Sequence, residues 1–335
     1  MGLDKAFGFW NSVNSGDFNG DGKLDLICGN LGVNSKYELY GNNGLVWHVG
    51  DLSGAGVQDV FESYYPIGSG KLFPIRNYGE VLAAIPFIQE LYEGYSDYAS
   101  TTTDQFLGEQ LDQLNKMHIT KFESVIYLNK GGTFEMIDLP VDAQLSPVFG
   151  ISVADFDGDG YEDAFLAQNF FPTRSGFPRL DSGKGLLLKG NGDGSFLSLG
   201  PTESGIKITG DQRGAAASDF NNDGKVDLLV GQNNGQSKLY KNINAKKGLI
   251  VRLKGQEKNP KSIGAKIQLL SLTGQGAVRE IKAGGGYRSQ NSATQVLTIN
   301  QDVASKLKVI WPNGNITEKS ISHDSATIEI EEPLK

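Results

Sequence analysis

The sequence has few residues of the types used in nucleophilic, redox and zinc chemistry. Cys28 is the one cysteine, so no intrachain disulfide can form, and it lies in an apolar run typical of a buried structural thiol. The three histidines, His48, His118 and His323, are far apart and match neither metal-ligand nor catalytic-triad spacing. Neither a G-x-S-x-G motif nor a phosphate-binding glycine loop is present. We therefore expect a protein that is not an enzyme.

Long apolar runs and positive charge are also scarce. No stretch reaches the ~18 apolar residues of a transmembrane helix, and residues 1–5 lack the basic and apolar segments that begin a signal peptide. The 31 Lys and Arg against 39 Asp and Glu give a formal charge of −8. Such a balance disfavours nucleic acid and anionic membranes as partners. Divalent cations are the expected counterpart.

Glycine, by contrast, is abundant, at 44 of 335 residues, and hydrophobic residues make up 39% of the chain. This composition fits many short strands joined by tight turns, and it argues against disorder. The length allows two domains, each with its own core. The sequence therefore predicts an all-β protein of two domains.

One unit recurs along the chain, with a short apolar run on each side of an Asp-rich loop. Its clear copies occupy residues 17–25, 155–163 and 219–227, and probable hairpins follow at 125–134 and 186–196. Several strands in a repeat of roughly 40 to 60 residues are typical of a β-propeller blade. A degraded copy at 51–59 has Ser53 at position 3 and Ala55 at position 5, and we expect a plain turn there. Loops at equivalent places in successive blades are the predicted arrangement.

The spacing between the loops at 51 and 155 requires an insertion. Apolar residues from about Glu80 to Leu114 are spaced like the buried faces of two helices, which could cap the scaffold or present a surface to a partner. The predicted first domain is therefore 1–246, a repeat region with a helical insertion at about 80–114.

From Lys247 the repeat stops and a partly alternating apolar pattern begins. It predicts six strands and a small β-sandwich or open barrel in a second domain, 247–335, with strands at 250–253, 265–270, 277–281, 295–299, 307–311 and 326–330. Asp302 and Asp324 are the only aspartates there, too far apart for one loop. We expect no Asp-loop calcium site in this domain.

The Asp loops have the chemistry of calcium sites. Calcium takes six to eight oxygen ligands, which side chains at positions 1, 3, 5 and 9 and the backbone carbonyl at position 7 could supply. A glycine at position 6 permits the sharp turn. The predicted ligands of about three structural Ca²⁺ sites are Asp17, Asn19, Asp21, Lys23 and Asp25; Asp155, Asp157, Asp159, Tyr161 and Asp163; and Asp219, Asn221, Asp223, Lys225 and Asp227.

Two other interpretations of these loops are open to test. An EF-hand needs a bidentate Glu at position 12, but Cys28, Leu166 and Val230 stand there, so sheet and not helix should follow each loop. Asp, Asn and Gly also form plain turns, yet three copies with the same spacing favour metal. The loop at 155 has four carboxylates that repel one another, and we expect it to gain most from calcium.

These loops with their aliphatic flanks resemble FG-GAP/VCBS repeats, and the C-terminal region resembles the ASPIC/UnbV domain. The second likeness rests on Asn259, 263–265, 284–287, Ser289, Gln290 and 311–314. The resemblance implies calcium-binding β-propeller blades similar to those of integrin α-chains. Family propellers have six to eight blades, which implies further blades from a longer parent chain.

Weak calcium loops fill only where calcium is plentiful, so we expect a secreted or cell-surface, extracytoplasmic protein, and the lack of a signal peptide suggests the C-terminal part of a longer chain. The expected role is adhesion or the binding of an extracellular glycan or protein. Two alternatives remain: an accessory or catalytic region of a polysaccharide-active enzyme, with Asp59 and Glu62 as acid and base, or a structural spacer. Aromatic residues on exposed loops would indicate a binder, the candidates being Tyr64, Tyr65, Phe170, Phe171 and Phe177.

Overall fold

The computed structural model of the chain describes residues 2–40, 44–52, 54–84, 86–173, 177–271, 274–299, 305–322 and 325–334. The chain forms two compact units. The first contains Trp10–Asn34 and Glu123–Lys335, and the second contains Leu3–Phe9 and Ser35–Phe122. We call them unit 1 and unit 2 and describe each by itself. The predicted boundary at 246/247 stays a prediction.

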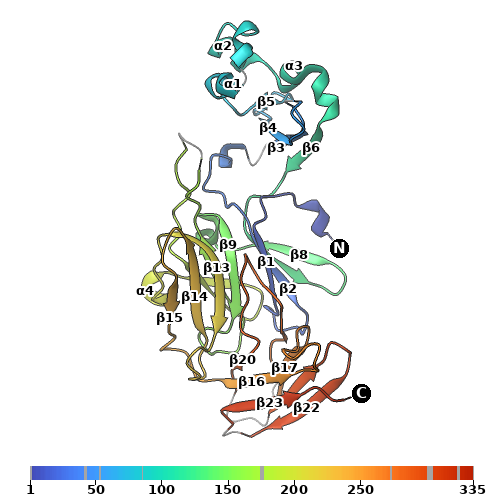
Figure 1. The fold of residues 1–335 in the computed structure, drawn as a ribbon, viewed down its shortest axis with the longest axis vertical. Coiled ribbons are helices and arrows are strands. Elements are labelled where there is room, and N and C mark those ends of the chain that lie inside the picture. The colour runs from blue at the N-terminus through green and yellow to red at the C-terminus, as the bar shows by residue number, and fades with distance from the viewer. Residues whose placement is uncertain are drawn as a thin grey trace. The chain divides into compact units, whose positions relative to one another are not determined.

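Three of the antiparallel sheets in the described part of unit 1 form the repeat region, and we call them blades 1, 2 and 3 (Figure 1). Blade 1 has the strand order β1 (Ser12–Gly16), β2 (Asp25–Gly29), β7 (Val125–Asn129) and β8 (Phe134–Asp138). Blade 2 runs through β9 (Val148–Ala154), β10 (Asp163–Gln168), β11 (Leu186–Gly190) and β12 (Phe196–Leu199). Blade 3 runs through β13 (Asp211–Ser218), β14 (Asp227–Asn233) and β15 (Lys238–Tyr240).

The blades confirm the propeller-type repeat that the sequence predicts. The expected hairpins are β7–β8 and β11–β12, and their turns contain Gly131 at φ 80° and Gly192 at φ 76°. A left-handed residue is what such tight turns require. The short helices η5 (Val141–Gln144) and α4 (Pro201–Ser204) link successive blades.

Apolar side chains bury the faces between blades. One core cluster joins blades 1 and 2 and includes Ile27, Ile126, Val148, Ile151, Leu166 and Leu188, all at most 1% exposed. A second joins blades 2 and 3 and includes Phe165, Ala167, Ala215, Leu228 and Val230. Every residue of β10 is buried, because the strand lies inside the stack with neighbours on both faces. Cys28 is buried as expected, and burial raises the pKa of its thiol to about 11.

Unit 2 contains a fourth antiparallel sheet of order β5 (Phe73–Pro74), β4 (Asp59–Tyr64), β3 (Leu45–Gly50) and β6 (Asn115–Ile119). Its helices are η1 (Leu3–Lys5), η2 (Glu38–Tyr40), α1 (Tyr78–Ala84), η3 (Pro86–Glu90), α2 (Tyr95–Ser100), α3 (Thr103–Leu107) and η4 (Gly108–Gln113). The helical insertion is thus confirmed, with a small core around Tyr78, Val81, Ile88 and Tyr98. Ile85, part of the predicted face, lies outside the described residues.

The helices of this insertion are shorter than the two that the apolar spacing predicts. Pro86 lacks the N–H that would continue α1. Gly94 precedes α2 at φ 156°, and Gly108 ends α3 at φ 54°. Both angles are outside the helical region, so the backbone changes direction at each glycine. The result is a series of short helices.

One of the four Asp loops does not belong to a blade of unit 1. Strand β2 pairs directly with β7, with Leu26 opposite Tyr127 and Cys28 opposite Val125. Residues 35–122 are therefore an insertion within blade 1. The degraded loop at 51–59 lies in this insertion, between β3 and β4, and not in unit 1.

The C-terminal residues form two further sheets around one core. One sheet has the order β20 (Gln295–Leu297), β16 (Leu249–Lys254) and β23 (Thr327–Glu331). The other has the order β18 (Gly274–Gln275), β17 (Lys266–Ser271), β21 (Ser305–Ile310) and β22 (Ile316–Ile321), and β19 (Arg279–Glu280) also pairs with β17. Leu249, Ile267, Val309, Trp311 and Ile328 are buried in the core. This is the predicted sandwich-like arrangement.

Five of the six predicted C-terminal strands match described strands closely, and the sixth, 277–281, is reduced to the two residues of β19. Strand β22 was not predicted, because it is polar apart from its ends and only Ile321 in it is buried. Asp302 and Asp324, on which the absence of an Asp-loop site was argued, lie outside the described residues.

A glycine-rich segment, residues 284–292, connects this domain to the blades along their first strands. Asn291 accepts hydrogen bonds at Oδ1 from Ser152 in β9 (2.9 Å) and from the N–H of Ala217 in β13 (2.9 Å), and it donates to Val153 (3.1 Å). Gly286 has φ 67°, and a Cβ there would lie 2.7 Å from the nitrogen of Ile151. The glycines of this segment therefore permit a close backbone approach.

Candidate metal centre

The four Asp loops are built into hairpins of the same register. Position 9 of each loop pairs with the residue immediately before position 1: Gly16 with Asp25, Gly50 with Asp59, Ala154 with Asp163, and Ser218 with Asp227. Position 9 is in each case the first residue of a strand. The prediction that sheet follows the loops is confirmed, and the EF-hand interpretation is excluded.

Each loop turns through two residues of left-handed backbone. Position 6 is the expected glycine, with φ of 83° at Gly22, 99° at Gly160 and 81° at Gly224. Position 4 is left-handed too, with φ of 69° at Gly20, 75° at Gly158 and 57° at Asn222. The second turn could have been found in the sequence, because position 4 is always Gly or Asn, the residues that tolerate this conformation.

The position 1 carboxylates point into the loops, where each accepts the N–H of position 6, at 3.0 Å for Asp17, 2.9 Å for Asp155 and 2.9 Å for Asp219. Asp17 is 1% exposed. Its Oδ1 is buried and has no hydrogen-bond partner within the described ranges. Burial raises the pKa of Asp17. A buried carboxylate oxygen without a partner is costly unless a cation or water completes it.

Positions 3 and 5 supply the next oxygens, and each position 3 side chain accepts the N–H of position 5. The distances are 3.1 Å for Asn19, 3.0 Å for Asp157 and 3.0 Å for Asn221. In the loop at 155, carboxylate oxygens of Asp155, Asp157 and Asp159 all lie within 4.8 Å of one another. This cluster could hold a metal ion, and its oxygen chemistry suits a hard cation.

The position 9 aspartates have a structural role that the sequence did not indicate. Oδ2 accepts the N–H of position 2, at 3.0 Å for Asp25, 2.7 Å for Asp163 and 3.2 Å for Asp227. Oδ1 accepts an N–H at or just beyond the end of the third strand, from Asn129 (2.7 Å), Gly190 (2.8 Å) and Asn242 (2.7 Å) respectively. Burial raises the pKa of all three, that of Asp163 to about 8. Each therefore joins the second strand of its blade to its own loop and to the end of the third strand, without any metal.

Position 7 was expected to offer its backbone carbonyl. The structure shows that its N–H donates to the position 5 carboxylate, at 2.9 Å from Lys23, 3.0 Å from Tyr161 and 3.1 Å from Lys225. The side chain at this position is lysine in two loops and tyrosine in the third, which fits a role for the backbone. Their carbonyls stay predicted ligands.

The degraded loop in unit 2 keeps the hairpin hydrogen bonds. Asp51 accepts the N–H groups of Ala55 (3.0 Å) and Gly56 (2.8 Å), and Asp59 accepts that of Leu52 (3.1 Å). Ala55 offers no side-chain oxygen at position 5, and Ser53 lies outside the described residues. This hairpin forms with a predicted ligand missing, so positions 1 and 9 suffice to shape the loop.

The C-terminal domain contacts two of the loops directly. The N–H of Val278 donates to Oδ2 of Asp17 (3.0 Å), and the hydroxyl of Thr298 donates to Oδ2 of Asp155 (2.6 Å). Arg279 forms a buried ion pair with Glu162, the residue at position 8 of the loop at 155, and lies 3.9 Å from Asp155. The position 1 carboxylates of these loops are therefore shared between the blades and the C-terminal domain.

Two protein families match this chain. The FG-GAP repeat matches residues 9–49, which include the first loop, and the ASPIC and UnbV domain matches residues 255–334. The chain thus carries an FG-GAP repeat and an ASPIC and UnbV domain, and its repeat region consists of propeller-type blades. Both resemblances drawn from the sequence are confirmed.

Curated relatives with detectable similarity are described as cartilage acidic protein 1. The mouse protein is 24% identical over 202 residues, 59% of this chain and 30% of its own length, and the Xenopus tropicalis protein is 24% identical over 203 residues, 59% and 31%. The human protein is 24% identical over 193 residues, 56% of this chain and 28% of its own length. The chain thus corresponds to under a third of each relative. None of the helices in the described ranges is long and apolar enough to cross a membrane.

Proposed function

We propose that this chain is a calcium-binding, non-enzymatic repeat module of a secreted or cell-surface protein. The observation that carries the proposal is the shared geometry of the loops at Asp17, Asp155 and Asp219. Among the described residues, a buried oxygen of Asp17 has no hydrogen-bond partner, and a convergent acidic cluster surrounds Asp155. Calcium would be held by positions 1, 3 and 5 with help from positions 7 and 9. Its role would be structural, since it would neutralise buried carboxylates between strands.

Three lines of support favour a location outside the cytoplasm for this module. FG-GAP repeats occur in integrin-like extracellular propellers, and the relatives are named for cartilage. Extracellular calcium modules work with dissociation constants of ~10⁻⁴ to 10⁻³ M, a range that cytosolic calcium does not reach.

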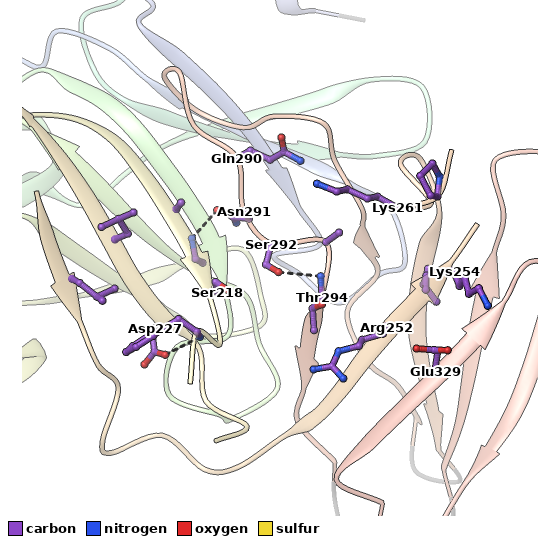
Figure 2. A pocket seen from close by; sticks show the side chains of 18 residues that line it. Ser218, Asp227, Arg252, Lys254, Lys261, Gln290, Asn291, Ser292, Thr294 and Glu329 are labelled. Carbon is purple, nitrogen blue, oxygen red and sulfur yellow. Dashed lines mark hydrogen bonds between the residues drawn. The ribbon is translucent and has the colours of Figure 1, made fainter. Parts of the chain in front are cut away.

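A groove in unit 1 supports a binding role. It has a volume of about 910 Å³ and lies between blade 3 and the C-terminal domain (Figure 2). Three cations of the C-terminal domain line it, Arg252, Lys254 and Lys261, as do two carboxylates, Asp227 and Glu329, and the exposed Leu229 and Leu239 of blade 3. The cations outnumber the carboxylates by one, and this small excess of positive charge beside apolar side chains suits an acidic glycan or an acidic protein segment.

The aromatic residues suggested by the sequence give less support to glycan binding. Tyr64 packs on Tyr40 with ring centroids 4.6 Å apart, and Phe170 packs on Phe149 at 5.9 Å. Arg179 lies 4.9 Å from the centre of the Phe171 ring. These rings are half-buried against neighbours, so the groove is the stronger candidate for ligand contact.

The enzymatic alternative has little support from Asp59 and Glu62. They lie three residues apart on β4, so their side chains leave opposite faces of the strand. Oε2 of Glu62 pairs with Lys36 at 3.1 Å, and its Oε1 accepts the Tyr37 hydroxyl. Both carboxylates of the suggested acid and base pair therefore serve structural contacts.

The proposal is tested by calcium titration of the whole chain, read by calorimetry, followed by glycan and protein binding with and without calcium. We expect uptake with dissociation constants of ~0.1–1 mM. Arg252→Ala and Lys261→Ala should weaken the binding of an acidic ligand, whereas Lys306→Ala, an exposed change elsewhere in the domain, should not. New reducing ends or unsaturated sugars after incubation with polysaccharides would favour the enzymatic alternative. The absence of any ligand would favour a spacer.

A further inference from the structure

In each blade, one residue at the end of the third strand or just beyond it has a position that is fixed by a hydrogen bond to the loop. The N–H that position 9 accepts belongs to Asn129, Gly190 or Asn242. The residue just before each of these is therefore equivalent in the three blades. These residues are Leu128, Lys189 and Lys241.

The two lysines at this place reach the predicted metal ligands. The Lys189 ammonium forms a close ion pair with Asp157 and lies 2.7 Å from Oδ2 of Asp159, so it bridges positions 3 and 5 of its loop. Lys241 lies 3.5 Å from Oδ2 of Asp223, position 5 of its own loop. Leu128 is 3% exposed and packs in the core between blades 1 and 2, so blade 1 has no cation at this place.

From these contacts we propose that Lys189 is an internal cation of the loop at 155 and competes with calcium for Asp157 and Asp159. The inference rests on the proposed calcium binding. An ammonium held by two carboxylates neutralises part of their charge. Calcium has to displace it, and this is feasible because the side chain of Lys189 is 32% exposed and can turn to solvent. Lys241 acts in the same way on the loop at 219, but more weakly, through one carboxylate.

In the loop at 17, the cation that pairs with a predicted ligand comes from the loop itself. Lys23, at position 7, lies 2.8 Å from Oδ2 of Asp21, and its side chain is 44% exposed. It contacts one carboxylate, two residues away on the same turn, and the buried Oδ1 of Asp17 has no hydrogen-bond partner in the part of the chain that the structure describes. The loop at 17 should therefore fill at the lowest calcium concentration. This order is the opposite of the one that counting carboxylates predicts, because Lys189 already relieves the repulsion in the loop at 155.

The test is calcium titration of a full-length background in which Asp21→Ala and Asp223→Ala disable the other two loops. Lys189→Leu, which installs the residue found in blade 1, should lower the half-saturating calcium concentration of the remaining loop roughly fivefold, the scale of a partly exposed ion pair. Lys306→Leu is the matched control, since it removes a lysine paired with Glu318 at 3.6 Å in the C-terminal domain. It should leave the concentration within twofold of the parent. Adding Asp159→Ala to Lys189→Leu should abolish the uptake.

The outcomes separate this inference from the proposed function. Equal half-saturation in the parent and in Lys189→Leu would overturn the competition while leaving calcium binding intact. Calcium uptake by Lys189→Leu where the parent has none up to millimolar concentrations would support the competition, even if the native loops were never filled. If the parent, Lys189→Leu and the wild type all fail to take up calcium, both the competition and the proposed calcium binding are overturned. A thermal melt of each variant in EDTA shows that it is folded.

Discussion

The N–H of Asn129 donates a 2.7 Å hydrogen bond to Oδ1 of Asp25, across a separation of 104 residues. The same bond joins Gly190 to Asp163 and Asn242 to Asp227 within much shorter stretches of chain. Blade 1 is thus assembled like its neighbours although all of residues 35–122 intervene. The position 9 carboxylate makes the same hydrogen bond whether the third strand follows closely in the sequence or after a long insertion.

We expect the position 9 aspartates to stabilise the fold even without metal. Asp163→Ala would leave the buried N–H groups of Phe156 and Gly190 without an acceptor, at a cost of roughly 2–4 kcal/mol in the free energy of unfolding. Asp157→Ala removes a partly exposed partner of Lys189 and should cost ~1 kcal/mol or less in EDTA. Urea denaturation of both variants in EDTA measures the difference, and equal losses would contradict the metal-independent role of position 9.

Asn291 should contribute as much to the free energy of unfolding as a buried core residue does. Its side chain makes three hydrogen bonds to β9 and β13, and Asn291→Ala would leave Ala217 N–H unpartnered. We expect the free energy of unfolding to fall by roughly 2–3 kcal/mol, in EDTA and in calcium alike. Gln290→Ala, next in sequence but exposed, is the control and should change it by less than ~0.5 kcal/mol. A loss confined to the calcium condition would mean that the segment acts through the metal loops.

Unit 2 should be dispensable for the folding of unit 1. Within unit 1, Asn30 donates two hydrogen bonds beside the insertion point, from its N–H to Ser124 Oγ (3.0 Å) and from its side-chain amide to the Glu123 carbonyl (3.2 Å). Replacing residues 35–122 with a short Gly/Ser linker should leave a cooperative unfolding transition and calcium uptake. Calorimetry and circular dichroism of this deletion variant test the expectation, which fails if the remaining chain melts without cooperativity.

The stabilisation that calcium gives should depend on pH. Burial raises the pKa of Asp163 to about 8, above its unfolded value near 4, so the metal-free native state holds the extra proton between these values. Its contribution is therefore present at low pH and is lost as the pH rises toward 8. Calcium favours the ionised carboxylate, so the calcium-dependent gain in melting temperature should be larger at pH 8 than at pH 5.5.

Burial lowers the pKa of His48 below its unfolded value. This contribution to the free energy of unfolding increases as the pH rises through the same range. That contribution is common to both conditions and cancels when the melting temperature in EDTA is subtracted from that in calcium. A calcium-dependent gain that is the same at both pH values would contradict the assignment of Asp163 to a metal-linked site.

How far the sequence predicts this structure depends on whether a feature is local. The loops, their flanking strands and the hairpins of blades 1 and 2 follow from turn residues and apolar runs of a few residues each. The pairing of β2 with β7 did not, because an apolar pattern records burial and not the identity of the partner strand. Strand β22 was missed for a related reason, since an exposed edge strand with mainly polar residues shows no alternation.

The candidate site was predicted in part for the same reasons. Residue types and spacing identified the acidic positions, whereas Lys189 and Thr298 come from distant parts of the chain and gave no local signal. Asp25, Asp163 and Asp227 are predicted metal ligands and also accept structural hydrogen bonds. The second role could not be predicted from the sequence, because it depends on the third strand of each blade. Sequence spacing indicates which oxygens can converge, and the fold decides which of them are already used.

The central claim, that these loops are calcium sites, is tested most directly by thermal unfolding of the wild-type chain in ~1 mM calcium and in EDTA. At a dissociation constant of ~0.1 mM, each filled loop adds roughly 1.4 kcal/mol to the stability of the native state. One to three filled loops should then raise the melting temperature by about 3 °C or more. Asp21→Ala should reduce the rise, whereas Asp51→Ala should lower the melting temperature equally in both conditions. Identical melting of the wild type in calcium and in EDTA would contradict the account.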